Sequence, residues 1–295
     1  MEREFLKVFS SKSVAVIIPT YNRAHLLERV LPTYVQPGVE QIIVVNDAST
    51  DNTELVLKAL STRIPILEFI TNDRNRKQMF SKNRGVALAK TKYIYFGDDD
   101  SFILPGTIEA LVSTINHTGV DVVGCRALYM REGETLQNLF IRCNQHATIS
   151  DDLFDLKTFR HEFHKVVDDP IRVLTFQACF LIESDLARSH SFFEYFIGPA
   201  QREESDYLIR LSARGYRLAY TSAGCQINLP RSEATGGSWG NPLYRELSLL
   251  VNILIFSIRN YTYLKNTAGP FFVVRHIAYV MRSKIRVLVG MILGV

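Results

Sequence analysis

The amino-acid sequence predicts an α/β protein in which a mostly parallel, Rossmann-like sheet is flanked by helices and followed by a helical C-terminal tail. Short β-branched runs alternate with helical stretches between residues 14 and 125, as is typical of parallel sheets with helices on both faces. Polar clusters follow three of these runs. Apolar and basic residues, with no acidic ones, make up the segment after Glu246, which sets the tail apart from the rest of the chain.

The expected strands of the first half are short and rich in Val, Ile and aromatic residues, which favour extended backbone. They comprise residues 13–18, 41–46, 66–70, 92–96 and 121–125. Helical segments lie between them, and Asn22 is expected to cap the first helix. The expected helices comprise residues 25–34, 54–60, 81–90 and 106–116. This regular alternation predicts a single sheet for the first half of the chain.

The second half is expected to be less regular. Residues 126–170 are polar and predict a loop-rich excursion. The apolar run 173–182 predicts one strand, and residues 203–216 predict a helix that Gly215 ends. Residues 226–241 contain one proline and three glycines, so we expect a flexible, lid-like loop there.

Composition narrows the class of protein. With 295 residues, 47% of them apolar and 22% charged, the chain is long enough for one large folded domain and is not globally disordered. The start of the chain lacks the apolar run of a secretory signal. The cysteines are far apart with no C-x-x-C pair, which favours a reducing cytoplasmic compartment and disfavours a structural zinc site. They are Cys125, Cys143, Cys179 and Cys225.

Three polar clusters lie directly after expected strands. They are residues 19–23, 46–51 and 97–100. In an open parallel sheet the ligand crevice lies beyond the carboxyl ends of the strands, so these clusters are expected to meet at one edge. The chain has no P-loop, no G-x-G-x-x-G and no G-x-S-x-G motif, which disfavours ordinary ATP-binding, dinucleotide-binding and serine-hydrolase sites.

Asp98, Asp99 and Asp100 are the strongest candidate metal ligands. Adjacent carboxylates repel one another unless a cation lies among them, and oxygen ligands suit Mg²⁺ or Mn²⁺. The alternative interpretation is a solvated loop or helix cap, because Pro105 and Gly106 open a helix shortly afterwards.

Other polar residues are open to a structural or a functional interpretation. Asp47 either forms an Asx-turn or binds a nucleobase or ribose. Glu203, Glu204 and Asp206 begin a helix, where they either complement its macrodipole or provide a general base. A basic cluster before the fourth strand is either a solvated face or a contact to a diphosphate. It consists of Arg74, Arg76, Lys77, Lys82 and Arg84.

Four segments together resemble family 2 glycosyltransferases with the GT-A fold. In order, these are VAVIIPTYNR from Val14, IIVVNDASTDNT from Ile42, KNRGVALAKTKYIYFGDDDSFILPGTIEAL from Lys82 and EESDYLIRLSARGYRL from Glu203. The resemblance covers roughly residues 12–220 and keeps the order and spacing of the family. It implies a catalytic domain over residues 1–240, followed by the helical, basic segment of residues 241–295.

The resemblance also implies roles for individual residues. Glu204 would be the catalytic base, with Glu203 as the alternative because the chain has Glu-Glu where the family usually has Glu-Asp. A divalent metal, Mn²⁺ or Mg²⁺, would be held by Asp98 and Asp100. The residues expected to bind the nucleotide sugar are Pro19, Thr20, Tyr21, Asn22, Asp47, Lys82, Arg84, Asp98 and Asp99.

The implied reaction is inverting transfer of a sugar from a nucleoside diphosphate sugar, with a UDP-sugar favoured, to a hydroxyl of a glycan or lipid-linked acceptor. Surface polysaccharide biosynthesis is the expected setting. Many relatives have a His after the strand that follows the base, whereas this chain has none there. Two alternatives remain: Asn228 or Arg231 takes its place, or the metal is held less tightly. The alternatives are a nucleotidyltransferase and a noncatalytic nucleotide- or glycan-binding module.

The tail is expected to contact a membrane from its cytoplasmic side, as a peripheral helix on the inner face of the cell membrane. Six of the 34 basic residues follow Glu246, whereas none of the 30 acidic residues do, so the body is nearly neutral and no nucleic-acid partner is expected. Basic residues lie roughly opposite one apolar helix face, although Lys284 is an exception. That face comprises Ile277, Met281, Ile285, Leu288 and Ile292, and the basic residues are Arg275, Arg282 and Arg286. The alternative is a helix that packs on the catalytic domain or on a partner.

Overall fold

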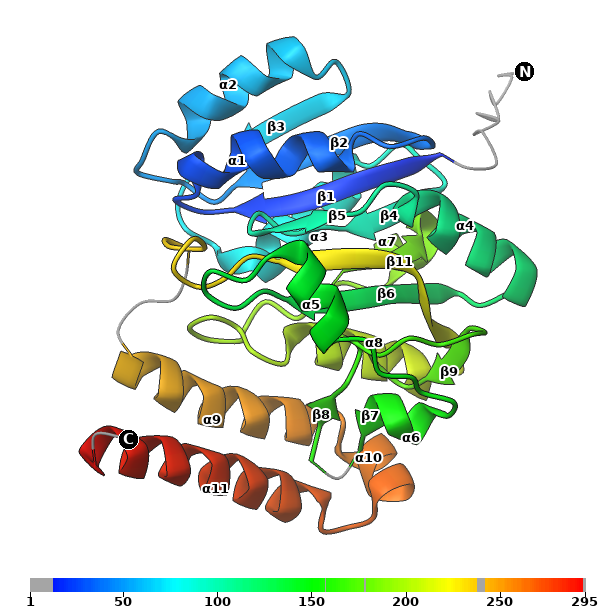
Figure 1. Cartoon of the computed structure of the whole chain (residues 1–295), viewed down its shortest axis with the longest axis vertical. Coiled ribbons are helices and arrows are strands. Elements are labelled where there is room, and N and C mark those ends of the chain that lie inside the picture. Colours follow the sequence, from blue (N-terminus) through cyan, green and yellow to red (C-terminus); the bar gives the residue numbers. More distant parts are fainter. Residues whose placement is uncertain (1–12, 157, 178, 238–241, 294–295) are drawn as a thin grey trace, which may run out of the picture.

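One large sheet lies in the middle of the molecule, with helices on both of its faces (Figure 1). The computed structural model describes residues 13–156, 158–177, 179–237 and 242–293, and their side chains except those of residues 242–243 and 283–293. Its strands are β1 Val14–Thr20, β2 Val39–Asn46, β3 Leu67–Thr71, β4 Tyr93–Phe96, β5 Ser101–Ile103, β6 Val122–Tyr129, β9 Ile171–Val173, β10 Phe180–Glu183 and β11 Leu218–Asn228. A separate small hairpin pairs β7 Phe154–Asp155 with β8 Arg160–His161.

The strand order is β3-β2-β1-β4-β10-β6-β11-β5, and β9 pairs with β11 beside this path. Strands β3, β2, β1 and β4 are parallel, and β6 and β11 run in the same direction because β10 opposes both β4 and β6. Strands β5 and β9 also run against β11. The sheet is therefore mostly parallel, which confirms the predicted fold class.

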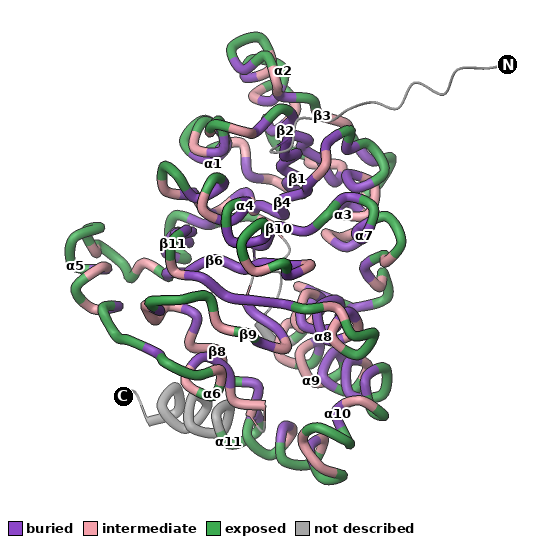
Figure 2. The backbone as a smooth tube through the Cα atoms, turned by 90° about the vertical axis from the view of Figure 1, so that its right-hand side faces the viewer, coloured by how far each residue is buried: buried purple, intermediate pink, exposed green. Residues whose placement is uncertain are grey.

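Helices cover the sheet and continue below it. They are α1 Ala24–Val30, η1 Leu31–Tyr34, α2 Thr53–Arg63, α3 Lys77–Leu88, α4 Thr107–Thr118, α5 Leu136–Arg142, α6 Ser150–Leu153, α7 Ser184–Ser189, α8 Glu203–Ala213, α9 Pro242–Arg259, α10 Tyr261–Ala268 and α11 Phe272–Leu293. Figure 2 shows the central strands as the buried part of the molecule, with exposed residues concentrated in outer helices and turns. This layering buries both faces of the sheet, as a mostly parallel sheet requires.

The residues of β1 show why this strand lies at the centre. All seven are buried, and alternate side chains enter different hydrophobic clusters. Ala15 and Ile17 pack in one cluster, whereas Val16 and Ile18 pack in the other. Because side chains alternate across a strand, an uninterrupted apolar run fits only a strand covered on both sides.

Two local predictions are wrong for identifiable reasons. Asn22 does not cap the first helix: it has a positive φ of 53°, and its side-chain oxygen accepts from the Thr50 backbone N–H, so Arg23 is the N-cap residue. The expected strand 173–182 is divided between β9 and β10. Buried Phe176 lies between them against Gly124, so the continuous apolar pattern reports burial and not a continuous strand.

The expected loop 226–241 begins later than predicted, because β11 extends to Asn228 between β5 and β6. Gln226 is buried in that strand, and its side-chain oxygen accepts from the Tyr95 hydroxyl at 3.2 Å. The region 126–170 is also more ordered than predicted, since it includes α5, α6 and the β7–β8 hairpin.

The C-terminal helices pack against α8 below the sheet (Figure 1). Asp206 of α8 is fully buried and accepts from Arg259 Nε at 3.0 Å and from Asn260 Nδ2 at 2.9 Å. Arg202 Nη2 lies 3.0 Å from Nε2 of His276, at the start of α11. These contacts join the tail to the helix that begins with Glu203 and Glu204.

Part of the expected apolar face of the tail lies outside the described side chains, namely Ile285, Leu288 and Ile292, as do Lys284 and Arg286. Ile277 is half-buried, and Met281, Arg275 and Arg282 are exposed. Among the described residues, no single helix has the length and apolar composition to cross a membrane. The segments Tyr244–Arg259 and Tyr261–Ala268, bent by 84° between them, meet that criterion only as a pair.

Candidate active site

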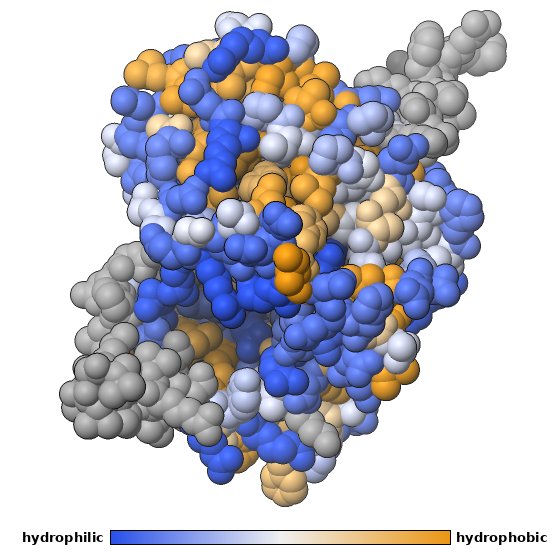
Figure 3. Space-filling model, in the orientation of Figure 1, coloured by the Kyte–Doolittle hydropathy of each residue, from blue (hydrophilic) through white to orange (hydrophobic). Residues whose placement is uncertain are grey.

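Two adjoining cavities open at the carboxyl ends of β1, β2 and β4, the edge where the sequence predicts a site. Their volumes are about 190 Å³ and about 430 Å³. A hollow bordered by hydrophilic residues is visible near the middle of the face in Figure 3. Five residues line both cavities, so ligands in the two would be neighbours. These five are Gln78, Asp98, Asp100, Pro199 and Gln201.

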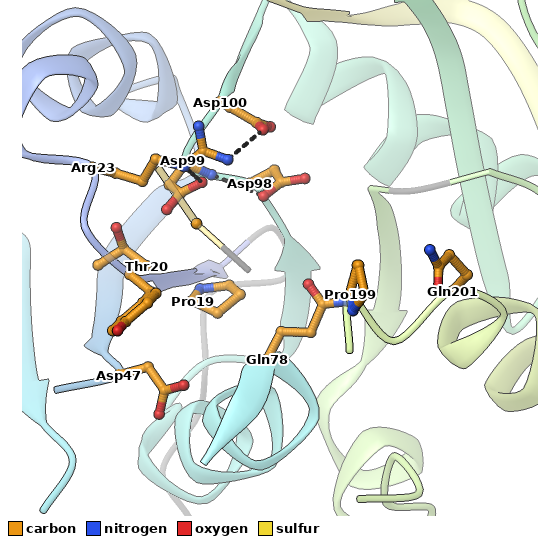
Figure 4. Close-up of a pocket in the computed structure, with 12 residues that line it drawn as sticks. Pro19, Thr20, Arg23, Asp47, Gln78, Asp98, Asp99, Asp100, Pro199 and Gln201 are labelled. Atoms are coloured by element: carbon orange, nitrogen blue, oxygen red, sulfur yellow. Dashed lines mark hydrogen bonds and ion pairs between the residues drawn. The ribbon is translucent and has the colours of Figure 1, made fainter. Parts of the chain in front are cut away.

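The three aspartates directly after β4 form one cluster (Figure 4), with carboxylate oxygens within 4.8 Å of one another. Burial, together with the neighbouring carboxylates, raises the pKa of Asp98 and Asp99 to about 7 and that of Asp100 to about 6. Tyr34 holds the backbone here, since its hydroxyl donates to the Asp98 carbonyl at 3.0 Å. Three crowded carboxylates of raised pKa are an oxygen donor set that fits Mg²⁺ or Mn²⁺, which would relieve their repulsion.

Arg23 provides positive charge beside this cluster. Its Nη2 lies 3.1 Å from Asp100 Oδ2, and its Nε lies 3.6 Å from Asp99 Oδ1. Figure 4 shows the guanidinium next to these aspartates. The arginine is 3% exposed, so solvent screens these ion pairs poorly.

The smaller cavity is lined by Pro19 and Thr20 at the end of β1, by Tyr21 directly after it, and by Asp47 after β2. Asn22 does not line it, because its side chain binds the Thr50 backbone N–H. The carboxylate of Asp47 is already engaged. It accepts from Asn72 Nδ2 at 2.7 Å and from the backbone N–H groups of Arg76 at 2.7 Å and Lys77 at 2.8 Å. Asp47 therefore fixes the start of α3 while it also faces the cavity.

Lys82 lies between the two glutamates at the start of α8. Its Nζ donates to Glu203 Oε1 at 2.7 Å and to Glu204 Oε1 at 2.9 Å. Burial lowers the pKa of Lys82, but the two carboxylates outweigh it, so the pKa is raised. Burial also raises the pKa of Glu203 to about 8, although Lys82 opposes this shift. The three side chains form a buried, hydrogen-bonded cluster with net negative charge when both glutamates are ionised.

The two glutamates differ in access to the larger cavity. The side chain of Glu204 is 30% exposed, whereas that of Glu203 is 3% exposed. Gln78 Nε2 also donates to Glu203 Oε1, at 3.0 Å. A reacting hydroxyl in the cavity can reach Glu204 more readily, so the geometry favours Glu204 over Glu203 as a base.

The remaining predicted site residues occupy different places. Asn228 and Arg231 line the larger cavity, although Asn228 Nδ2 donates to the Leu128 carbonyl at 3.1 Å. Lys82 contacts the glutamates instead of lining either cavity. Arg84 lines neither cavity and donates to Asn72 Oδ1 at 2.6 Å, so it supports the partner of Asp47.

The structure also brings in residues that were not singled out from the sequence. Arg23 is the last residue of the polar cluster 19–23, but no individual role was predicted for it. Gln78 of α3 and Tyr129 at the end of β6 also line the cavities. Further lining residues come from connecting segments, namely Gln177, Pro199, Gln201 and Gly237. No local pattern marks these residues, because their place depends on how separate elements pack.

The chain matches the family model described as Glycosyl transferase family 2 over residues 15–188. It is 28% identical over 134 residues to the uncharacterized glycosyltransferase YibD of Escherichia coli K12, covering 44% of this chain and 39% of that protein. It is 29% identical over 158 residues to the GalNAc(5)-diNAcBac-PP-undecaprenol beta-1,3-glucosyltransferase of Campylobacter jejuni, covering 52% of this chain and 50% of that one. The chain thus spans half or less of the length of these relatives.

Solved structures share the fold at lower identity. Residues 1–349 of S. aureus TarS in complex with UDP-GlcNAc superpose with a TM-score of 0.62 and 16% identity. The match covers 90% of this chain and 73% of that one. It includes most of the chain, so it supports the fold across the sheet and the helices around it.

Proposed function

This chain belongs to glycosyl transferase family 2, and we propose that it is an inverting transferase that moves a sugar from a nucleoside diphosphate sugar to an acceptor hydroxyl. One observation supports this most directly: Asp98, Asp100 and Glu204 line the same cavity. A single displacement needs both a place where charge on the leaving diphosphate is stabilised and a base for the attacking hydroxyl. The larger cavity brings both kinds of group together.

The donor would occupy the smaller cavity with its nucleoside and reach the aspartates with its diphosphate. Thr20, Tyr21 and Asp47 line the nucleoside end, and Asp99 lies between them and Arg23. We favour a UDP-sugar as the donor, and the fold shared with S. aureus TarS in complex with UDP-GlcNAc is consistent with that choice. Asp98 and Asp100 would hold a divalent metal, which when bound neutralises charge on the leaving diphosphate.

Glu204 would take the proton from the acceptor hydroxyl as the oxygen attacks the anomeric carbon from the side opposite the diphosphate. Lys82 orients the carboxylate by donating to Glu204 Oε1, which leaves Oε2 for the acceptor. Glu203 holds the other side of the ammonium at 2.7 Å. We therefore propose that Glu204 is the base and that Lys82 and Glu203 position it.

We propose a glycan or lipid-linked glycan as the acceptor, in surface polysaccharide biosynthesis. The relative from Campylobacter jejuni is named for transfer to a glycan on undecaprenyl diphosphate. The larger cavity, about 430 Å³, lies on the Glu204 side of the aspartates and offers Tyr129, Gln177 and Asn228 to such a ligand. An aromatic ring with amide groups around it suits a sugar ring.

We also propose peripheral contact with the inner face of the cell membrane, through the C-terminal helices. The outer face of α9 is apolar and exposed at three- and four-residue intervals, while Ser248, Asn252 and Phe256 on its inner face are buried. The exposed residues are Tyr244, Leu247, Val251, Leu254 and Ile258, with Phe271, Val274 and Met281 on or beside α11.

Charge favours a lipid surface for this face. Lys265 of α10 and Arg275 and Arg282 of α11 are exposed, and no acidic residue follows Glu246. Each basic residue near an anionic bilayer contributes about 1 kcal/mol. The four cysteines are buried free thiols, which suits the reducing cytoplasmic side.

The test of the reaction is a donor screen with the purified chain. A panel of nucleotide sugars would be tested with and without Mn²⁺ or Mg²⁺, and release of nucleoside diphosphate and thermal stabilisation would be measured. Glu204→Gln and Asp100→Ala would be tested in parallel, with Glu194→Gln as the matched surface control.

Metal-dependent release of one diphosphate that is lost in both site variants but kept in the control would support the proposal and name the donor. Stabilisation by a donor without turnover, even with glycan acceptors added, would favour a binding module. Absence of donor binding under every condition would contradict the proposed activity.

A further inference from the structure

We propose that Arg23 is a built-in competitor of the divalent metal for Asp100 and that it couples metal binding to the loop of residues 233–237. The inference rests on the proposed function because it concerns the same aspartate cluster. It goes beyond that function by assigning a role to an arginine that is neither the proposed base nor a proposed metal ligand.

Arg23 and a bound divalent metal would both place positive charge next to Asp100. Arg23 Nη2 lies 3.1 Å from Asp100 Oδ2, and Nε lies 3.6 Å from Asp99 Oδ1 with no hydrogen-bond partner of its own. A cation held by Asp98 and Asp100 would therefore lie beside a buried guanidinium. Like charges at such a distance repel strongly in a poorly screened site, so the metal and Nη2 of Arg23 compete for the same carboxylate.

The other end of the Arg23 guanidinium contacts the loop of residues 233–237. Arg23 Nη1 donates to the Thr235 carbonyl at 2.7 Å. Because a guanidinium is rigid and planar, Nη2 cannot leave Asp100 without moving Nη1 relative to Thr235. Arg23 therefore contacts both a proposed metal ligand and a loop that is more than 200 residues later in the sequence.

The loop itself is fastened to the segment around Arg23. The Gly237 N–H donates to the Tyr21 carbonyl at 3.1 Å, and His25 Nε2 lies 3.1 Å from the Glu233 carbonyl oxygen. Gly237 lines the smaller cavity, and a Cβ there would lie 2.7 Å from Arg23 Nη2. The positive φ of 64° at Gly237 favours glycine, and the hydrogen bond to Tyr21 holds the loop beside the smaller cavity.

The expected sequence of events follows from these contacts. With no metal, Arg23 neutralises part of the cluster and holds the loop closed. A divalent cation that enters with the diphosphate displaces Nη2 from Asp100, and the loop loses its Arg23 contact as the donor site fills.

The test uses the full chain and Mn²⁺ alone, without any nucleotide. The Mn²⁺ dissociation constant would be measured by titration for the wild type and for Arg23→Gln, which keeps a planar polar group but removes the charge. Arg29→Gln is the matched control, because Arg29 pairs with Glu233 of the same loop but not with the aspartates. We expect roughly tenfold tighter Mn²⁺ binding in Arg23→Gln and no change in Arg29→Gln.

Hydrogen exchange of the Gly237 amide supplies the second readout. In the wild type we expect Mn²⁺ to speed exchange several-fold. In Arg23→Gln exchange should be fast already and insensitive to Mn²⁺. Arg23→Lys keeps the charge but cannot bridge both groups, so it should bind Mn²⁺ with wild-type affinity while exchange at Gly237 stays fast.

Three results would overturn the inference: Mn²⁺ binding in Arg23→Gln that is no tighter than in the wild type, exchange in the wild type that ignores Mn²⁺, or no Mn²⁺ binding by any of the proteins. If Arg23→Gln fails to fold, the Lys variant and the wild type still decide the coupling. Failure of the transferase reaction would show in the donor screen and would leave these metal measurements intact.

Discussion

The ammonium nitrogen of Lys82 lies 2.9 Å from Oε1 of Glu204, a residue 122 positions later in the chain. This contact joins α3, which begins beside the nucleoside end of the site, to α8, which begins with the base. The distance between the two residues in sequence means that only packing of both helices against the sheet creates the pair. Four testable predictions follow from this cluster and from the tail.

Replacing Glu204 by Gln should lower kcat by about 10²–10⁴-fold, because a positioned general base contributes that much to proton transfer. Donor binding should persist, since the amide oxygen still accepts from Lys82. Rates of product formation and the dissociation constant of the donor would be measured together. An enzyme that loses donor affinity but keeps kcat would place the base elsewhere, with Glu203 as the next candidate.

Replacing Lys82 by Met should destabilise the protein by about 3–5 kcal/mol above about pH 8, where the buried carboxylate of Glu203 is ionised and would be left without its cation. Glu203 is only 3% exposed, so water cannot replace the lost partner. Lys82→Arg restores a positive charge and is the matched control. Urea unfolding of both variants measures the difference, and equal stability of the two would show that the charge of Lys82 is not what stabilises this cluster.

Replacing Glu203 by Gln should change how stability depends on pH. Burial raises the pKa of folded Glu203 to about 8 from an ordinary value of 4.5, so its contribution to stability is fully present below pH 4.5 and is lost as the pH rises through about 8. Gln does not titrate. The free energy of unfolding of Glu203→Gln relative to the wild type should therefore increase by roughly 1 kcal/mol per pH unit between about pH 6 and about pH 8.

Denaturant unfolding across that pH range, with Lys82 left in place, measures this effect. The increase should level off above about pH 8, where Glu203 is ionised in both the folded and the unfolded wild type. A difference that stays constant with pH would mean that Glu203 ionises in the folded protein near its ordinary pKa.

Replacing Leu254 by Glu on the outer face of α9 should weaken binding to anionic vesicles by about tenfold or more, because it removes apolar contact and adds a like charge. Leu254 is 46% exposed, so the fold should tolerate the change. Leu55→Glu on α2 is the matched control, since Leu55 is 64% exposed and far from the tail in sequence. Co-sedimentation with vesicles measures both variants, and equal loss would point to net charge instead of this face.

Local sequence determined the elements and the edge at which the site lies. The apolar strand β1 had to be buried on both faces, and its last residues Pro19 and Thr20, with Tyr21 after them, had to lie at its carboxyl end. The aspartates after β4 were predictable for the same reason. Residue type at the end of a buried strand is a local property, so a single sequence shows it.

Tertiary structure decided which polar groups meet. Lys82 was expected at the nucleotide but lies against Glu203 and Glu204. Arg23 belongs to the polar cluster 19–23 that the sequence places at this edge, but its ion pairs with Asp99 and Asp100 were not predicted. Asp47, expected to face a nucleoside, also uses its carboxylate to fix the start of α3. Such pairings depend on the packing of elements far apart in the chain, and no local spacing records them.

The tail shows the same division. Its basic, apolar composition is a property of the sequence after Glu246, and it predicts a helical segment with one apolar side. Which side faces outward was decided by docking on α8: Asp206 draws in Arg259 and Asn260, so the outer face of α9 is left exposed. A buried carboxylate must be paired, so these contacts, together with the buried residues Ile253 and Phe256, set the orientation of the helix.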